Sequence, residues 1–284
     1  MSSSSSSNPV ILPPRYQPVT QSLISGGFGS VQKVHDSFLD REVLFKSMQD
    51  KANNGQLVNE IQSLSKARSR HVVEIYDVIS DDQGNVVGII IELLTGRDFS
   101  QFYTEDKTNS NNYLRVLYQI STALKDLHNS DVVHRDLKLD NLRESASGLL
   151  KIFDFGISTS GTDYRTKNNR GTYVYAAPEL YIKNAEITPE MDVYAFGVCA
   201  WALATNIWPG ELISQPPQLK GRAPSIDSVL PGWLPQEVAQ LIDACLHPDP
   251  NSRPLAQVLS QEFSRQLVRG EAPGCICSRY NSNL

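Results

Sequence analysis

The sequence predicts an α+β fold with two lobes, an N-terminal antiparallel sheet that carries one helix and a mainly helical C-terminal lobe. Short apolar runs separated by turn residues lie at 31–34, 43–45, 72–79 and 86–94, a pattern typical of strands. After Gly96 the apolar residues recur at helical spacing instead. This change of pattern separates the two lobes.

Composition limits the classes of protein to which the chain can belong. The 284 residues include 40% hydrophobic residues, enough for a sizeable core, and the formal charge of -5 gives no support to broad binding of nucleic acid. The apolar stretches are too short to cross a membrane and the start lacks the pattern of a secretory signal, so we expect an intracellular, cytoplasmic protein with no transmembrane segment. The four cysteines form no regular framework, which fits free thiols in a reducing compartment.

Four segments are expected along the chain. Residues 1–15, rich in serine and proline, are expected to be a disordered tail, 16–94 the N-lobe, 95–268 the C-lobe, and 269–284 a C-terminal tail. The serines of the first tail are better explained as solvated chain than as phosphorylation sites. The second tail holds Cys275 and Cys277, which are too few for a zinc site.

Helices are expected at five places. In the N-lobe, Leu57, Ile61 and Leu64 recur at helical spacing after Gly55. In the C-lobe, Thr188 is expected to cap a helix that begins with Pro189 and is apolar nearly all round, so that it belongs in the middle of the lobe. The C-lobe helices are expected over residues 111–129, 193–204, 235–246 and 254–268.

Three features of the N-lobe suit phosphate binding. The glycines of the segment 25–31 lie between two predicted strands and would let backbone amides approach a triphosphate, although this segment alone is better explained as an ordinary turn. Lys46 ends an apolar strand, where either a phosphate partner or water at a sheet edge would explain a lysine. Glu60, on the inserted helix, is placed to pair with Lys46.

The segment 132–142 carries the strongest signal. It reads His-Arg-Asp, then Leu-Lys, then two residues and Asn, and so resembles the catalytic loop of the protein kinase family. Asp-Phe-Gly at 154–156 and Ala-Pro-Glu at 177–179 match two further motifs of that family in its order. The resemblance covers about 16–268 and implies the bilobal protein kinase fold.

The resemblance also implies roles for matching positions. Asp136 would accept or orient the proton of the substrate hydroxyl, and Lys138 would balance charge at the γ-phosphoryl group. Asn141 and Asp154 would coordinate Mg²⁺, or alternatively Mn²⁺, while Lys46 would hold the α and β phosphates of ATP.

A set of positions is expected around ATP. Ile91 falls at the gatekeeper position, the backbone of Glu92 and Leu94 would meet adenine, and Asp98 would either meet the ribose hydroxyls or simply start a helix. Ile24 departs from the family, which has a glycine there; we expect weaker nucleotide affinity or a stiffer loop, but no loss of chemistry. The expected ATP-binding residues are Ile24, Gly26, Gly27, Gly29, Val31, Lys46, Glu60, Glu92, Leu94 and Asp98.

Substrate class and control follow from the same resemblance. Lys138 and Thr172 are typical of kinases that phosphorylate serine or threonine, so we expect protein substrates of that kind and autophosphorylation, with self-association as one route. A loop phosphate would pair with Arg135, whereas Arg165, Lys167 and Arg170 beside Asp163 explain a loop ordered without modification equally well. The candidate acceptors are Ser158, Thr159, Ser160, Thr162, Thr166 and Thr172.

Three structural side chains complete the expectation. Glu179 and Arg253 match a buried ion pair of the family, and Asp192 matches the acid that supports the catalytic loop. Two other classes stay open, a catalytically silent ATP-binding scaffold and a kinase-like enzyme for small molecules. The complete set of catalytic residues disfavours the first, and the segment 172–179 disfavours the second.

Overall fold

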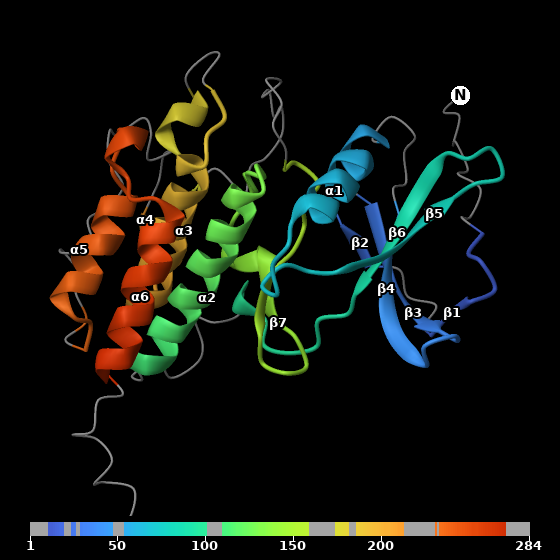
Figure 1. Cartoon of the computed structure of the whole chain (residues 1–284), viewed down its shortest axis with the longest axis horizontal. Coiled ribbons are helices and arrows are strands. Elements are labelled where there is room, and N and C mark those ends of the chain that lie inside the picture. Colours follow the sequence, from blue (N-terminus) through green and yellow to red (C-terminus); the bar gives the residue numbers. More distant parts are fainter. Residues whose placement is uncertain are drawn as a thin grey trace, which may run out of the picture.

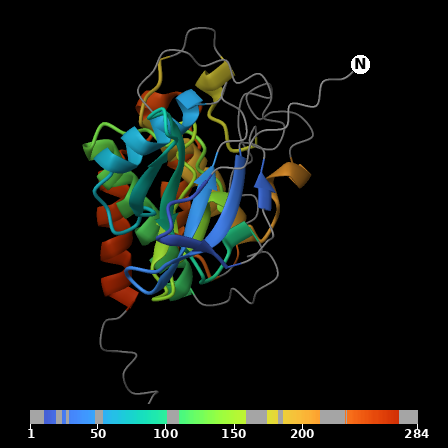
Figure 2. The same ribbon diagram turned by 90° about the vertical axis from the view of Figure 1, so that its right-hand side faces the viewer.

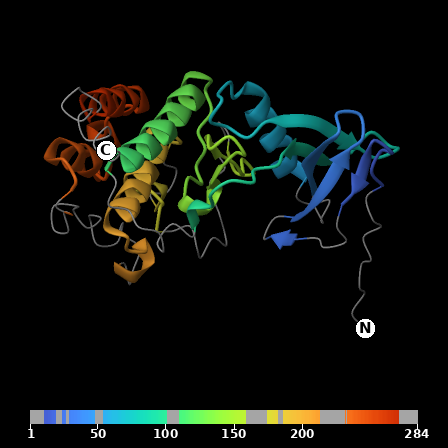
Figure 3. The ribbon, with the colours of Figure 1, turned by 90° about the horizontal axis from the view of Figure 1, so that it is seen from below.

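The computed structural model of the protein describes residues 11–19, 24–26, 29–47, 54–100, 110–158, 174–181, 186–212, 231 and 233–270. A sheet with one helix occupies one end of the molecule and a group of helices the other (Figure 1, Figure 3). The predicted α+β fold with two lobes is confirmed.

The N-lobe sheet is antiparallel and has the order β1-β3-β4-β6-β5, with β2 paired to β3. The helix α1 (Asn54–Lys66) lies between β4 and β5 in the chain and packs against the side of the sheet formed by β5 and β6 (Figure 2). The strands are β1 (Tyr16–Pro18), β2 (Ile24–Gly26), β3 (Gly29–Asp36), β4 (Arg41–Ser47), β5 (Ile75–Ser80) and β6 (Val86–Glu92).

The alternation of β4 divides its side chains between two faces of the sheet. Val43 and Phe45 are buried in a small cluster on one face together with Ile90. Leu44 and Lys46 point to the other face, where Leu44 packs against the main core of the protein. Lys46 therefore leaves the sheet on the side that faces α1 and the C-lobe.

The C-lobe is built around α3 (Glu190–Thr205), which is buried along nearly its whole length, as its apolar sequence predicts. A side chain at Gly197 would place its Cβ 2.8 Å from the Cβ of Cys245, so glycine allows α3 and α5 to approach closely. The other elements are α2 (Ser110–Asn129), η3 (Leu139–Asn141), β7 (Leu142–Glu144), β8 (Leu150–Ile152), η4 (Pro178–Tyr181), α4 (Pro209–Leu212), α5 (Gln236–Cys245), η7 (Pro250–Ser252) and α6 (Ala256–Gly270).

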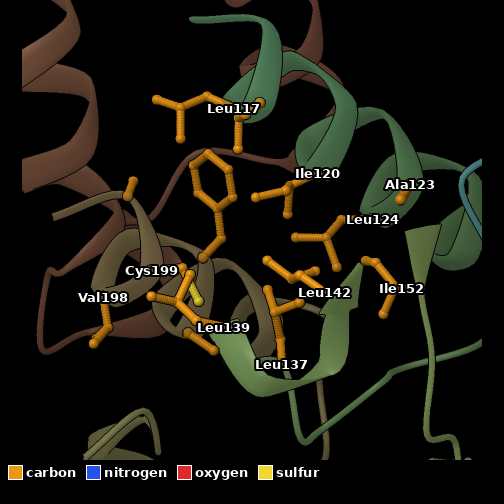
Figure 4. Packing of buried hydrophobic residues seen from close by; sticks show 14 of the residues in the cluster. Leu117, Ile120, Ala123, Leu124, Leu137, Leu139, Leu142, Ile152, Val198 and Cys199 are labelled. Carbon is orange, nitrogen blue, oxygen red and sulfur yellow. The ribbon is translucent and has the colours of Figure 1, made fainter. Parts of the chain in front are cut away.

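The apolar face of α2 holds the loop before β7 in place. Leu117, Ile120 and Leu124 of α2 point toward leucines of that loop, and all of these side chains are fully buried (Figure 4). The loop contributes Leu137 and Leu139, with polar residues between them. Burying alternate leucines fixes the backbone of the polar residues between them.

Two local predictions need correction. Thr188 does not cap α3: the N-cap residue is Pro189, and the helix begins one residue later, at Glu190. The run 72–79 is not one strand, because β5 starts at Ile75 and the backbone of Val72 pairs with Ile152 of the C-lobe. The other expected elements agree with the structure to within a few residues at each end. No helix among the described residues is long and apolar enough to cross a membrane.

Candidate active site

The carboxylate of Asp192 holds the start of the loop 134–141 in place. Asp192, fully buried in the first turn of α3, accepts the backbone N–H of His134 at 2.8 Å and that of Arg135 at 2.7 Å. His128, at the end of α2, donates from Nε2 to the same carboxylate at 3.0 Å. Burial alone would raise the pKa of Asp192, but the hydrogen bond and charge of His128 hold it below its ordinary value. The support expected from Asp192 is present.

One carboxylate oxygen of Asp136 accepts no hydrogen bond from a described residue. Its Oδ2 accepts Lys138 Nζ at 2.7 Å and Asn141 Nδ2 at 3.2 Å. Its Oδ1 is buried and has no hydrogen-bond partner among the described residues. A buried carboxylate oxygen without a partner is costly unless a ligand or water supplies a donor. Asp136 is therefore suited to accept a hydrogen bond from a hydroxyl group.

Lys46 joins the two lobes through two carboxylates. Its Nζ lies 2.8 Å from Glu60 Oε1 on α1 and 2.9 Å from Asp154 Oδ1 after β8, so the ion pair expected with Glu60 forms. Burial disfavours the charged form of Lys46, yet the two carboxylates outweigh it and raise its pKa. The pKa of Asp154 is lowered, because the charge of Lys46 outweighs the effect of burial.

Asn141 and Asp154 are tied together by the backbone. Phe153 N donates to Asn141 O at 3.1 Å, and Asp154 has a left-handed backbone with φ of 65°. The amide nitrogen of Asn141 donates to the backbone carbonyl of Asp136 at 2.8 Å, so its amide oxygen is left to act as a metal ligand. An amide oxygen and a carboxylate are hard donors that fit Mg²⁺, which keeps several waters and takes phosphate oxygens. The described residues contain no group of three or more His, Cys, Asp or Glu that could hold a metal without such help.

The expected ATP positions of the N-lobe occupy the first hairpin and the end of β6. Ile24 pairs with Val31 and Gly26 with Gly29 across β2 and β3, and Val31 pairs in turn with Lys46. Gly27 lies outside the described residues.

The segment that follows β6 is fixed to the C-lobe by ion pairs. The Glu92 carboxylate accepts Lys151 Nζ at 2.6 Å. The Asp98 carboxylate binds Arg143 and both donor groups of Ser100. Ile91 and Leu94 are buried. The carboxylate expected at the ribose thus already has partners.

Of the candidate phosphorylation sites, the structure describes Ser158. Ser158 is fully buried and donates from Oγ to Phe155 O at 2.6 Å, so in this conformation its hydroxyl is not available to an enzyme. The other candidates, Asp163 and the three cations expected beside it lie outside the described residues, as do Cys275 and Cys277. These others are Thr159, Ser160, Thr162, Thr166, Thr172, Asp163, Arg165, Lys167 and Arg170.

The ion pair expected between Glu179 and Arg253 is present and bidentate. Arg253 Nη1 and Nη2 lie 2.6 and 2.8 Å from the two oxygens of Glu179. Arg253 also donates to the backbone carbonyls of His247, Pro248 and Glu190. The arginine side chain is fully buried, so all of its charge is compensated inside the protein.

Sequence reasoning missed three residues near this site. Lys151 stands in the apolar run 149–153, and a lysine in a buried strand was a signal that it needs an acidic partner. His128 and Arg143 gave no such signal, because their partners Asp192 and Asp98 lie far away in the chain.

Comparison with known proteins gives a consistent result. The protein kinase domain family matches residues 18–264. The chain is 30% identical to the serine/threonine-protein kinase PrkC of Bacillus subtilis over 68% of the chain and 30% of that protein. It is 30% identical to the carbon catabolite-derepressing protein kinase of Saccharomyces cerevisiae over 83% of the chain and 38% of that protein. Aurora kinase C of Mus musculus is 28% identical over 87% of the chain and 91% of its own length.

The chain spans less than half the length of the first two of these relatives. The match of the family covers most of the chain and includes every residue of the site described above. The chain therefore belongs to the protein kinase domain family.

Proposed function

We propose that this domain transfers the γ-phosphoryl group of Mg-ATP to serine and threonine hydroxyls of proteins. The observation that carries the proposal is the partnerless Oδ1 of Asp136, buried beside Lys138 and Asn141. A substrate hydroxyl that donates to Oδ1 would place its oxygen for attack on phosphorus. Lys138 lies close beside Asp136, which limits the space for the substrate side chain. This favours the short hydroxyl side chains of serine and threonine.

The residues divide the work of the transfer. The substrate oxygen forms a bond to the γ-phosphorus, the bond from phosphorus to the oxygen shared with the β-phosphate breaks, and Asp136 takes the hydroxyl proton. Lys138 balances the charge that moves onto the transferred group. Lys46, which pairs with Glu60 and Asp154, would bind the α and β phosphates. Asn141 and Asp154 would hold Mg²⁺ or Mn²⁺, which supplies further charge neutralisation when bound.

Transfer of labelled γ-phosphate from Mg-ATP to generic protein substrates tests this function. We expect Asp136→Asn to lower the rate by about 100-fold or more, because the general base is lost while the size of the side chain is kept. Asp140→Asn is the matched control, since Asp140 is an exposed carboxylate of the same loop. Phosphoamino-acid analysis should give phosphoserine or phosphothreonine. Equal transfer by the wild type and Asp136→Asn would overturn the proposal.

Autophosphorylation in the segment 158–172 is proposed with it. Burial lowers the pKa of the Arg135 guanidinium to about 9, which still leaves it charged at neutral pH and able to pair with a loop phosphate. Mass spectrometry before and after incubation with Mg-ATP, at several protein concentrations, tests this step. A rate per molecule that rises with concentration would indicate transfer between two copies. Full activity with no phosphate in the segment would contradict a role for it.

A further inference from the structure

The two faces of the small β7–β8 sheet have different surroundings. Leu142 and Ile152 pair across the strands, are fully buried and belong to the core against α2. The next pair, Arg143 and Lys151, therefore points to the opposite face. Lys151 reaches Glu92 at the end of β6, so this second face looks toward the segment that joins the lobes.

Only one of these two cations is accessible. Lys151 is 6% exposed and is bound by Glu92, whereas Arg143 is 39% exposed. Asp154 follows β8 directly in the chain, so a nucleotide whose phosphates lie at Lys46 and Asp154 would bind beside this small sheet. Of the two cations on this face of β7 and β8, Arg143 is therefore the one that a ligand could contact.

Asp98 has little acceptor capacity left for a ligand. Its Oδ1 accepts both the backbone N–H and the hydroxyl of Ser100, at 2.9 and 2.7 Å, and its Oδ2 accepts Arg143. The backbones of Asp98 and Arg143 also form a β-bridge, which fixes the two residues relative to each other. The carboxylate is thus committed to interactions within the protein.

Arg143 has unused donors. A guanidinium carries five N–H groups, and Asp98 receives one of them at Nη2. Its Nε is buried and has no hydrogen-bond partner among the described residues. A buried donor of this kind needs an acceptor from a ligand or a water. The pair as a whole therefore offers more donors than acceptors to a ligand.

We propose that Arg143 recognises the sugar of the nucleotide by donating to a ribose hydroxyl oxygen, and that Asp98 acts as the positioning residue that holds the guanidinium in place. This inference rests on the proposed function, because it concerns the same ATP site. It makes the enzyme selective for ribonucleotides through a cation on β7, and it assigns to Asp98 a role different from direct contact with ribose.

Steady-state kinetics with ATP, 2′-deoxy-ATP and 3′-deoxy-ATP test the proposal. For the wild type, we expect kcat/KM to be about tenfold lower with at least one of the two analogues, the size expected for a lost hydrogen bond to a charged group. In Arg143→Leu this preference should fall to about twofold or less, with KM changed more than kcat. Asp98→Asn, which can still accept a hydrogen bond from Arg143, should keep most of the preference.

Controls separate sugar recognition from a loss of structure. Arg97→Gln is the matched variant, because it removes the ion pair with Glu144 that also joins this segment to β7, and it should leave the preference unchanged. Arg143→Lys keeps a cation and should restore part of the preference. Thermal unfolding of each variant checks the fold, and adenosine against 2′-deoxyadenosine in a binding assay gives the same comparison without turnover.

The outcomes are distinct. Preference that persists in Arg143→Leu and disappears in Asp98→Asn would show that Asp98 contacts the sugar, which overturns the inference and leaves the proposed function intact. A wild type that uses all three nucleotides equally, or an Arg143→Leu that weakens all three equally, also overturns it. A wild type that neither binds nor uses ATP would overturn the proposed function together with the inference.

Discussion

Asp192 and Arg135 are linked by a hydrogen bond of 2.7 Å between a fully buried carboxylate and a backbone amide 57 residues earlier in the chain. Arg135 has a left-handed backbone with φ of 74°, a conformation that costs free energy in a residue with a side chain. The second carboxylate oxygen holds the neighbouring amide of His134. One side chain of α3 thus fixes the strained turn that places Asp136.

Asp192→Ala should therefore damage both stability and catalysis. The change leaves two buried amides and His128 without their acceptor, so we expect the free energy of unfolding to fall by about 3 kcal/mol. In the protein that remains folded, kcat should fall more than the affinity for ATP, because the turn positions Asp136. Urea unfolding and ATP titration measure the two effects. Glu190→Ala, a partly exposed acid of the same helical turn, is the control.

The contribution of Asp192 should depend on pH in a fixed direction. Its pKa in the folded protein is lowered, since the hydrogen bond and charge of His128 outweigh burial. The stabilisation by a carboxylate of this kind is complete above its unfolded pKa of about 3.9 and is lost as the pH falls through the folded pKa. The difference in unfolding free energy between wild type and Asp192→Asn should be smaller near pH 3 than near pH 5. A difference that grows toward acid pH would contradict this account.

The residues proposed for catalysis stand out in the sequence because phosphoryl transfer requires particular side chains in a particular order. Lys46 and Glu60 are an example: strand and helix periodicity placed them, and their ion pair forms as expected. The contacts of Asp98 could not be predicted in this way. Its partner Arg143 is 45 residues away, and only the folded backbone brings β7 beside the segment after β6.

The two local predictions that were wrong concern residues for which more than one interaction is available. Thr188 has the side chain of a good cap, but the N-cap residue of α3 is Pro189, and no side chain caps the helix. Val72 is apolar and β-branched like a strand residue, yet its backbone pairs with β8 of the other lobe. Composition alone does not show which of two backbone partners a residue takes.

The buried pair Glu179–Arg253 should be more sensitive to loss of one partner than of both. Glu179→Leu leaves the fully buried guanidinium of Arg253 with carbonyl partners only, so we expect a loss of about 3–5 kcal/mol in the free energy of unfolding. Glu179→Leu combined with Arg253→Met removes both charges and should cost less than the sum of the single changes. Chemical denaturation of the four proteins of this cycle measures the coupling. Arg265→Met, which removes an exposed ion pair, should change stability by less than about 1 kcal/mol.

Lys138→Met should separate turnover from nucleotide binding. Lys138 Nζ contacts Asp136 Oδ2 at 2.7 Å and is far along the chain from Lys46, which is expected to hold the α and β phosphates. Its charge is most valuable where negative charge moves during transfer, so we expect kcat to fall by about 100-fold with little change in the Kd of ATP. Lys33→Met, at a half-exposed lysine of β3, is the control. If the Kd of ATP rose while kcat stayed unchanged, Lys138 would instead act mainly in binding the nucleotide, because its interaction would be the same before and during the transfer.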